Sequence, residues 1–213
     1  GALYQAVTRG NGYIGELVTG TVRAFRNVPL RIPFKGELLL RGEALMRYSD
    51  FERINAELPE TEAKYKNPRN LCTGTVRQLD PAVTAARGVY FHAFSLVEAE
   101  GVDFNNSRAA QFAWLRDQGF EVVEYETVTA ATLRDSVLRF ESKIRKNDFP
   151  SDGLVLLLDD IAYGESLGRT AKFPRNAIAF KWQDEQAETV LREIEWSPSR
   201  TGLINPVAIF DPV

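Results

Sequence analysis

The chain is poor in the residues that build disulfide frameworks and cysteine-based metal sites. Its 213 residues include one cysteine, Cys72, and one histidine, His92. A single cysteine excludes an internal disulfide and a multi-cysteine zinc site within the chain, and it fits a reducing compartment. We therefore expect a cytoplasmic protein. Because activation of a thiol needs a nearby base or positive field, and His92 lies in an apolar run, we expect Cys72 to be structural.

Long hydrophobic runs and a surplus of positive charge are also missing. No apolar run approaches the ~18–20 residues of a membrane-spanning helix, and the start has no signal-peptide pattern, so no membrane partner is expected. The 26 basic residues are outnumbered by 29 acidic ones, which gives a net charge of −3. Since nucleic-acid binders are normally basic, any such contact must come from a local patch. The absence of Walker and Rossmann glycine patterns lowers support for other phosphate chemistries.

One local basic patch is present, in the segment KYKNPRNLCTGTVRQLDP at 64–81. It shows neither helical nor strand periodicity, which predicts an irregular segment with a turn at Asn67-Pro68. Gly74, between two threonines, predicts backbone amides that face a ligand. Its basic residues against the single acid Asp80 suit contact with phosphates, and a solvated surface loop is the alternative. Those basic residues are Lys64, Lys66, Arg69 and Arg77.

Strand and helix patterns mix without a regular alternation, which favours an α+β fold with antiparallel sheets. The apolar spacing predicts helices at 16–25, from Ser49 (with Glu52 completing a capping box), from 106 or 107 to 119, and from Thr129. Strands are predicted at 3–8, 37–46, 88–97, 120–125, 154–158 and 178–182, and from 193 onward.

Three predicted strands carry a charge where packing favours an apolar residue: Glu43, Asp152 and Lys181. Each can point outward, because strand faces alternate. A charge on a buried position is costly unless it is paired or works on a ligand. The three together therefore indicate a shared cleft.

Such a cleft suits nucleotidyl transfer. A carboxylate at Glu43 can accept hydrogen bonds from ribose hydroxyls, and Lys181 with Arg9 can neutralise charge that builds on an α-phosphate. Asp152 can orient a lysine or take part in binding Mg²⁺, which prefers oxygen ligands. Phe94 or Tyr90 can stack on a base.

Several motifs together resemble bacterial NAD-dependent DNA ligases over essentially the whole chain. They are VTRGNGYIGE, LLLRGEALM, KNPRNLCTGTVRQLDP, VYFHAFS, SDGLVLLLDD, AIAFKW and SRTGLINPVAIFDPV, in that order. NPRN with the VRQLDP block is specific to that family, whereas the DG and FK pieces are shared by the wider nucleotidyltransferase superfamily.

The resemblance implies an ATP-grasp-like nucleotidyltransferase core of antiparallel sheets flanked by helices at 1–185, followed by the start of an OB-fold at 186–213. It implies an enzyme of DNA replication and repair that seals nicks between 3′-hydroxyl and 5′-phosphate ends. A lysine attacks the α-phosphate of NAD and releases nicotinamide mononucleotide. AMP then passes to the 5′-phosphate, and the 3′-hydroxyl displaces it. NAD, Mg²⁺ and nicked double-stranded DNA are implied, and the parent protein is expected to be a monomer.

The same resemblance assigns roles to individual residues. Arg9, Asp152 and Lys181 correspond to catalytic residues, and they also bind the nucleotide together with Glu43, Phe94 and Val155. Arg69 and Arg77 correspond to arginines that hold nicked DNA. No residue of this chain is implied as a dedicated metal ligand.

Two departures from the family pattern stand out. The lysine of the KxDG motif is absent and is expected roughly a dozen residues before Gly1, so the 213-residue chain alone is expected not to self-adenylate. Leu157 stands where the family often has a basic residue, and Lys172 is a candidate to compensate. Both chain ends indicate a piece of a longer protein. The helical NAD-binding region, zinc finger, helix-hairpin-helix region and BRCT domain of the family are outside it, and zinc is expected only there.

Two alternatives remain at this point. An ATP- or GTP-dependent nucleotidyltransferase, such as an RNA ligase or capping enzyme, shares the DG and FK features but not NPRN. A non-catalytic nucleic-acid-binding module is also consistent with a chain that lacks the nucleophile.

Overall fold

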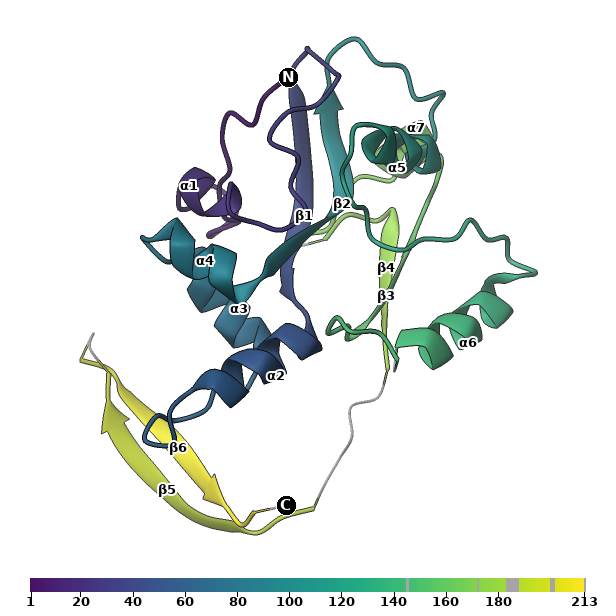
Figure 1. The fold of residues 1–213 in the computed structure, drawn as a ribbon. Helices are drawn as coiled ribbons and strands as arrows, with labels where there is room; N and C mark the ends of the chain where they lie inside the picture. The colour runs from purple at the N-terminus through teal and green to yellow at the C-terminus, as the bar shows by residue number, and fades with distance from the viewer. Residues whose placement is uncertain (145, 172, 183–187, 200–201, 213) are drawn as a thin grey trace. The chain divides into compact units, whose positions relative to one another are not determined.

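The computed structural model describes the chain except residues 145, 172, 183–187, 200–201 and 213. It divides into two compact units, Gly1–Phe180 and Lys181–Val213. The helices are α1 (Thr19–Val22), α2 (Tyr48–Glu57), α3 (Pro68–Val76), α4 (Pro81–Arg87), α5 (Arg108–Asp117), α6 (Leu133–Ile144) and α7 (Ile161–Ser166). The strands are β1 (Leu38–Met46), β2 (Val89–Ala99), β3 (Gly153–Leu157), β4 (Ala177–Lys181), β5 (Leu191–Pro198) and β6 (Ile204–Phe210) (Figure 1).

Strands β1 and β2 form an antiparallel pair with one covered face and one open face. Along most of β1, partly buried residues alternate with exposed residues. This alternation is expected for a strand whose successive side chains point to opposite faces of the sheet. Two register shifts interrupt the pairing, and they leave Phe94 and Val97 of β2 without a partner on β1. These are β-bulges, which re-aim side chains.

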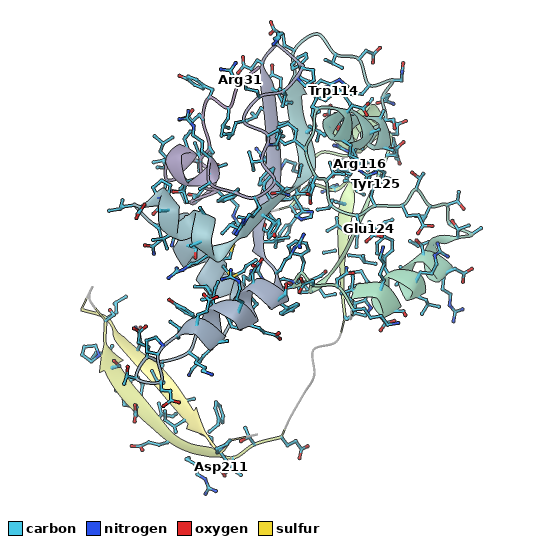
Figure 2. All side chains as sticks on the ribbon, viewed as in Figure 1. Arg31, Trp114, Arg116, Glu124, Tyr125 and Asp211 are labelled. Atoms are coloured by element: carbon cyan, nitrogen blue, oxygen red, sulfur yellow. The ribbon has the colours of Figure 1, made fainter. Side chains whose placement is uncertain are left out.

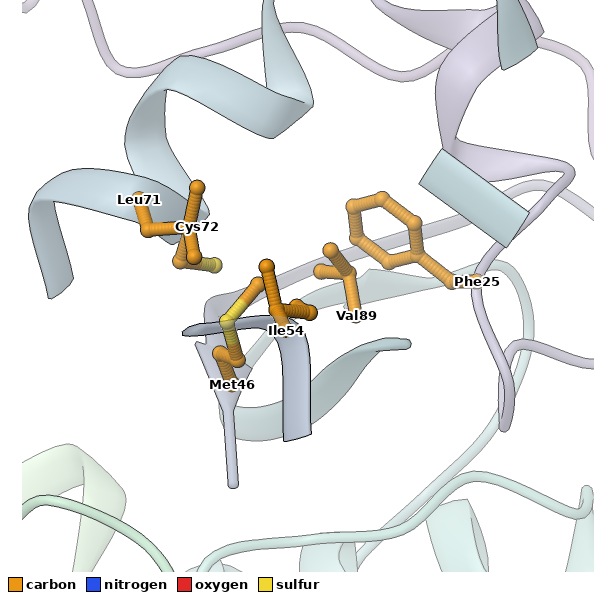
Figure 3. Close-up of a cluster of buried hydrophobic side chains, with 6 residues drawn as sticks. All are labelled: Phe25, Met46, Ile54, Leu71, Cys72 and Val89. Atoms are coloured by element: carbon orange, nitrogen blue, oxygen red, sulfur yellow. The ribbon is translucent and has the colours of Figure 1, made fainter. Parts of the chain in front are cut away.

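The first hydrophobic core lies where β1 and β2 meet the helices α2 and α3. Figure 3 shows its six buried side chains, which are Phe25, Met46, Ile54, Leu71, Cys72 and Val89. Burial, with the nearby Glu43 carboxylate as a smaller cause, raises the pKa of the Cys72 thiol to about 12. A thiol held neutral in this way is a poor nucleophile, so the structural role predicted for Cys72 is confirmed.

A second core joins the other end of β2 to α5. Phe112 and Leu115 of α5 are buried against Ala93 and Leu96 of β2. Around α5, Figure 2 shows Trp114, Arg116 and Tyr125, and the Arg116 guanidinium lies 4.9 Å from the centre of the Tyr125 ring. Ser107 caps α5 by accepting from Ala110 N at 3.2 Å, which confirms the predicted start of this helix.

The basic segment contains a helix, so the prediction of an irregular segment was wrong. Asn67 caps α3 by accepting from the backbone N–H groups of Arg69 and Asn70, and Pro68 occupies the first helical position. This cap with a following proline is a common helix start. Leu71, Cys72 and Thr75 form its buried stripe. Because Gly74 lies inside the helix, its backbone amide does not face a ligand as predicted.

Other elements also differ from prediction. The helix expected at 16–25 is only the four residues of α1, and 3–8 and 120–125 contribute isolated bridges rather than strands. Helix α2 has no side-chain cap, because the Ser49 hydroxyl donates to Asp148 at 2.5 Å instead. Helices α4 and α7 were not predicted.

Two further two-stranded sheets complete the described elements. β3 pairs with β4, and β5 pairs with β6 in antiparallel register within the second unit. The observed class is thus mixed α and β with small antiparallel sheets, as predicted. In the described ranges, no helix is both long and apolar enough to cross a membrane.

Candidate nucleotide and DNA site

Helix α3 brings the family-specific NPRN segment to the DG motif. Arg69, on the exposed side of α3, lies 3.9 Å from the Asp152 carboxylate, which directly precedes β3. Both side chains are 69% exposed, so the pair is an accessible contact between a cation and a carboxylate. Pairs of this kind contribute about 0–1 kcal/mol. The structure therefore places these two predicted residues together, with both side chains exposed to solvent.

A tight hairpin presents Arg9 and Glu16. Thr8 and Glu16 are joined by hydrogen bonds from Thr8 N to Glu16 O and from Glu16 N to Thr8 Oγ1, both of 2.9 Å. Between them, Asn11 Oδ1 accepts from the backbone of Tyr13 and Ile14 at 3.0 and 2.9 Å. Arg9 is exposed at the start of this turn.

The hairpin depends on glycine at two positions. The backbone of Gly10 has φ +52°, a conformation that residues with a side chain rarely adopt. At Gly15, a Cβ atom would lie 1.9 Å from the Thr8 carbonyl oxygen. Gly10 and Gly15 of the RGNGYIGE motif are therefore required by its backbone.

Glu16 is a site residue that sequence reasoning missed. Its carboxylate accepts a hydrogen bond of 2.9 Å from Arg77 Nε, and both side chains are about 60% exposed. Because Nε is the donor, the two terminal nitrogens of Arg77, Nη1 and Nη2, do not take part in this hydrogen bond. The two residues are 61 positions apart, so the sequence carried no signal for this pair.

Glu43 lies on the open face of the β1–β2 sheet. Its neighbours Gly42 and Ala44 are on the covered face, while Glu43 is exposed. It is paired across the strands with His92. This position agrees with a ligand-facing carboxylate.

The β-bulge presents Phe94 to solvent, where its side chain is 42% exposed. The ring of Tyr90, the alternative stacking residue, is already in contact with other side chains. The Arg47 guanidinium lies 4.3 Å from the Tyr90 ring centre, and Phe149 packs edge-on against the same ring at 5.5 Å. Phe94 is therefore the better placed of the two for stacking on a base.

His92 packs beside the same Phe149 ring. Burial lowers its pKa, and this outweighs the opposing effect of the Glu121 carboxylate. Its Nε2 lies 3.6 Å from Glu121 Oε2, too far for a hydrogen bond, and Nε2 has no hydrogen-bond partner among the described residues. Its ring packs edge-on against Phe149 at 4.9 Å.

The remaining predicted residues lie on β3 and β4. Val155 of β3 is 68% exposed, and Leu157 ends that strand. Lys181 is the last residue of β4 and the first residue of the second unit, so a cleft shared by Glu43, Asp152 and Lys181 stays a prediction. Lys172 lies outside the described residues.

The described residues contain no cluster of three metal-ligating side chains. Mg²⁺ is usually held by one or two carboxylates together with substrate phosphates. The exposed Asp152 carboxylate fits that mode of binding.

Comparisons with known proteins identify the family of the chain. Residues 1–185 match the model of the NAD-dependent DNA ligase adenylation domain. The chain is 62% identical over 213 residues to a DNA ligase of Lachnoclostridium phytofermentans and 60% identical to one of Ruminiclostridium cellulolyticum. It is 39% identical over 217 residues to a DNA ligase of Shouchella clausii.

Each of these alignments covers the whole of this chain but only 32–33% of the relative, so the chain spans about a third of their length. All three relatives are named DNA ligases, and none of the matches favours an RNA ligase, a capping enzyme or a non-catalytic module. The family match covers well over half of the chain and includes Arg9, Glu43, Arg69, Arg77, Phe94, Asp152 and Lys181. The chain therefore belongs to the family of NAD-dependent DNA ligase adenylation domains.

Proposed function

We propose that the full-length protein that contains this chain seals nicks in double-stranded DNA, with NAD as the adenylate donor. The contact between Arg69 and Asp152 at 3.9 Å carries this proposal. It joins the segment specific to NAD-dependent ligases to the motif shared by nucleotidyltransferases. Mg²⁺, a monomeric state, a cytoplasmic location and an OB-fold from about residue 186 belong to the same proposal.

The nucleotide side of the site consists of Arg9, Glu43, Phe94, Asp152 and Lys181. Phe94 offers an exposed ring face to adenine, and Glu43 accepts hydrogen bonds from the ribose. Arg9 and Lys181 stabilise negative charge on the α-phosphate as the lysine nucleophile attacks and nicotinamide mononucleotide leaves.

The DNA side consists of Arg69 in α3 and of Arg77, the residue that follows the last residue of this helix. Both side chains are exposed. Guanidinium groups bind phosphate oxygens in pairs, so both arginines suit the DNA backbone. Phosphate contacts of this kind position the substrate rather than read its sequence.

Self-adenylation tests the proposed function directly. Incubation of the full-length protein with NAD and Mg²⁺ is expected to add one AMP per molecule, measured by intact mass. ATP in place of NAD is expected to add none. A gain with ATP and none with NAD would identify a different class of nucleotidyltransferase.

The adenine-stacking role of Phe94 predicts a selective effect on NAD. Phe94→Ala is expected to raise the KM for NAD in self-adenylation roughly tenfold, because stacking a base on an aromatic ring contributes about 1–3 kcal/mol. Phe94→Tyr is expected to retain the wild-type value. Val97→Ala serves as the matched control, because Val97 is the other bulged residue of β2 and is 43% exposed. An unchanged KM in Phe94→Ala would remove Phe94 from the site.

A further inference from the structure

A pocket of about 310 Å³ opens beside α3. We call it the α3 pocket. Its walls come from residues 65–67, from one stripe of α3 and from Arg87 at the end of α4. That stripe includes Asn70 and Gly74, and Gln78 lies just beyond the end of α3, where its side-chain amide donates to Gly74 O at 3.3 Å. All three residues are exposed.

The α3 pocket is lined by positive and neutral groups. Lys66 and Arg87 are its two cations, and no carboxylate stands among the described residues that line it. Asn70 and Gln78 add side-chain amides, which can donate hydrogen bonds. Cations and neutral donors without a carboxylate favour an anionic ligand, and oxygen-rich phosphate is the group that such donors bind well.

Arg87 is held in place before any ligand arrives. Its guanidinium donates to Thr75 Oγ1 at 3.1 Å and to Tyr65 OH at 3.0 Å. Asn55 in turn fixes the Tyr65 backbone, accepting from its N–H at 2.8 Å and donating to its carbonyl at 3.0 Å. Since a guanidinium carries five N–H donors, these two bonds orient Arg87 without using all of them.

Gly74 has no structural reason to be a glycine. Inside a helix, glycine costs about 0.5–1 kcal/mol relative to alanine. The φ of Gly74 is not positive, and a Cβ atom there would meet nothing within 4 Å. The missing side chain leaves the wall of the α3 pocket open, which suits a ligand that approaches the helix backbone closely.

We propose that the α3 pocket binds a backbone phosphate of the DNA substrate, with Lys66 and Arg87 as its cations. The inference rests on the proposed function, because Arg69 of α3 and Arg77 at the end of this helix are the residues assigned to DNA. At 100° per residue, Asn70 and Gly74 lie about 100° and 140° around α3 from Arg69, on the exposed surface between Arg69 and the buried stripe of the helix. The pocket thus extends the DNA-facing surface by one further phosphate contact. Nucleotide phosphates share this chemistry, and the experiment separates the two sources.

The test measures binding of the full-length protein to a nicked duplex by fluorescence anisotropy across a range of salt concentrations. Lys66→Ala is expected to weaken binding roughly tenfold, as for loss of one charged hydrogen bond. The slope of log K against log [salt] should fall by about one, because one fewer counterion is released. Lys64→Ala removes the same charge from a position that does not line the pocket and is expected to have a clearly smaller effect.

Gly74 provides a second pair of variants. Gly74→Ala is expected to retain or raise the Tm, since its Cβ enters open space. Gly74→Glu places a negative group on the pocket wall and is expected to weaken DNA binding at least as much as Lys66→Ala. Equal losses in Lys64→Ala and Lys66→Ala, or wild-type binding in Gly74→Glu, would overturn the proposal.

Self-adenylation with NAD separates the possible failures. If the wild-type protein neither gains AMP from NAD nor binds nicked DNA, the proposed function itself fails. If it does both, and Lys66→Ala leaves DNA affinity and salt slope unchanged, only the α3 pocket is overturned. A higher KM for NAD in Lys66→Ala with unchanged DNA affinity would assign the pocket to nucleotide phosphates and also overturn the proposal.

Discussion

Replacement of Arg69 or Arg77 by alanine in the full-length protein is expected to lower nick sealing roughly hundredfold, the scale of loss when a substrate is misplaced in an active site. Self-adenylation with NAD is expected to change by no more than about twofold, since the exposed Arg69–Asp152 contact contributes little by itself. The reason is that both arginines are exposed, Arg69 on α3 and Arg77 at its C-terminal end, where they suit backbone phosphates. Measuring the rates of nick sealing and of self-adenylation on the same preparations checks that the substitutions affect the first step much more than the second.

Two further variants sharpen this expectation. Arg134→Ala removes a positive charge from the exposed side of α6, away from the proposed site, and is the matched control for both rates. Arg77→Lys is expected to recover little sealing, because an ammonium group cannot donate to Glu16 through one nitrogen and hold a phosphate with a separate fork. If Arg69→Ala or Arg77→Ala reduced both steps equally, a DNA-facing role for that arginine would be contradicted.

The sequence predicted the parts of the fold that have strong local patterns. The apolar residues of 37–46 predicted β1, and Ser107 with Gly119 bounded α5 correctly, since Gly119 has φ +92°. It failed for α3, where asparagine, threonine and glycine have low helix propensity. That helix is supported instead by tertiary packing of Leu71, Cys72 and Thr75, which a local pattern does not reveal.

The candidate site was predictable only as a set of separate residues. Glu43, Phe94 and Asp152 came from motifs, but the β-bulge that exposes Phe94 depends on its register against β1. The bond between Glu16 and Arg77 spans 61 positions, and Arg47 covers Tyr90 across a strand pair. These relations arise from folding in three dimensions, so spacing along the chain could not indicate them.

The hairpin of Thr8 and Glu16 carries the second large expected effect, because the proposed function assigns Arg9 to the nucleotide and Arg77, which Glu16 binds, to the DNA. Gly15→Ala is expected to lower self-adenylation and sealing together, each by at least roughly tenfold. A Cβ atom at 1.9 Å from the Thr8 carbonyl forces the backbone to move, and this displaces Arg9 on the nucleotide side and Glu16, which holds Arg77, on the DNA side.

Gly20→Ala is the matched control, since a Cβ atom at that exposed helical position would meet nothing within 4 Å. It is expected to retain both activities and to gain about 0.5–1 kcal/mol of stability. Gly15→Ala should lose several degrees of Tm, because overpacking costs about 1–3 kcal/mol and each kcal/mol is worth about 2–4 °C in a domain of this size. Loss of sealing alone in Gly15→Ala, with self-adenylation intact, would show that the hairpin positions Glu16 and Arg77 but not Arg9. Unchanged Tm and unchanged rates would mean that the hairpin tolerates the displacement, and its proposed role at both sides of the site would be wrong.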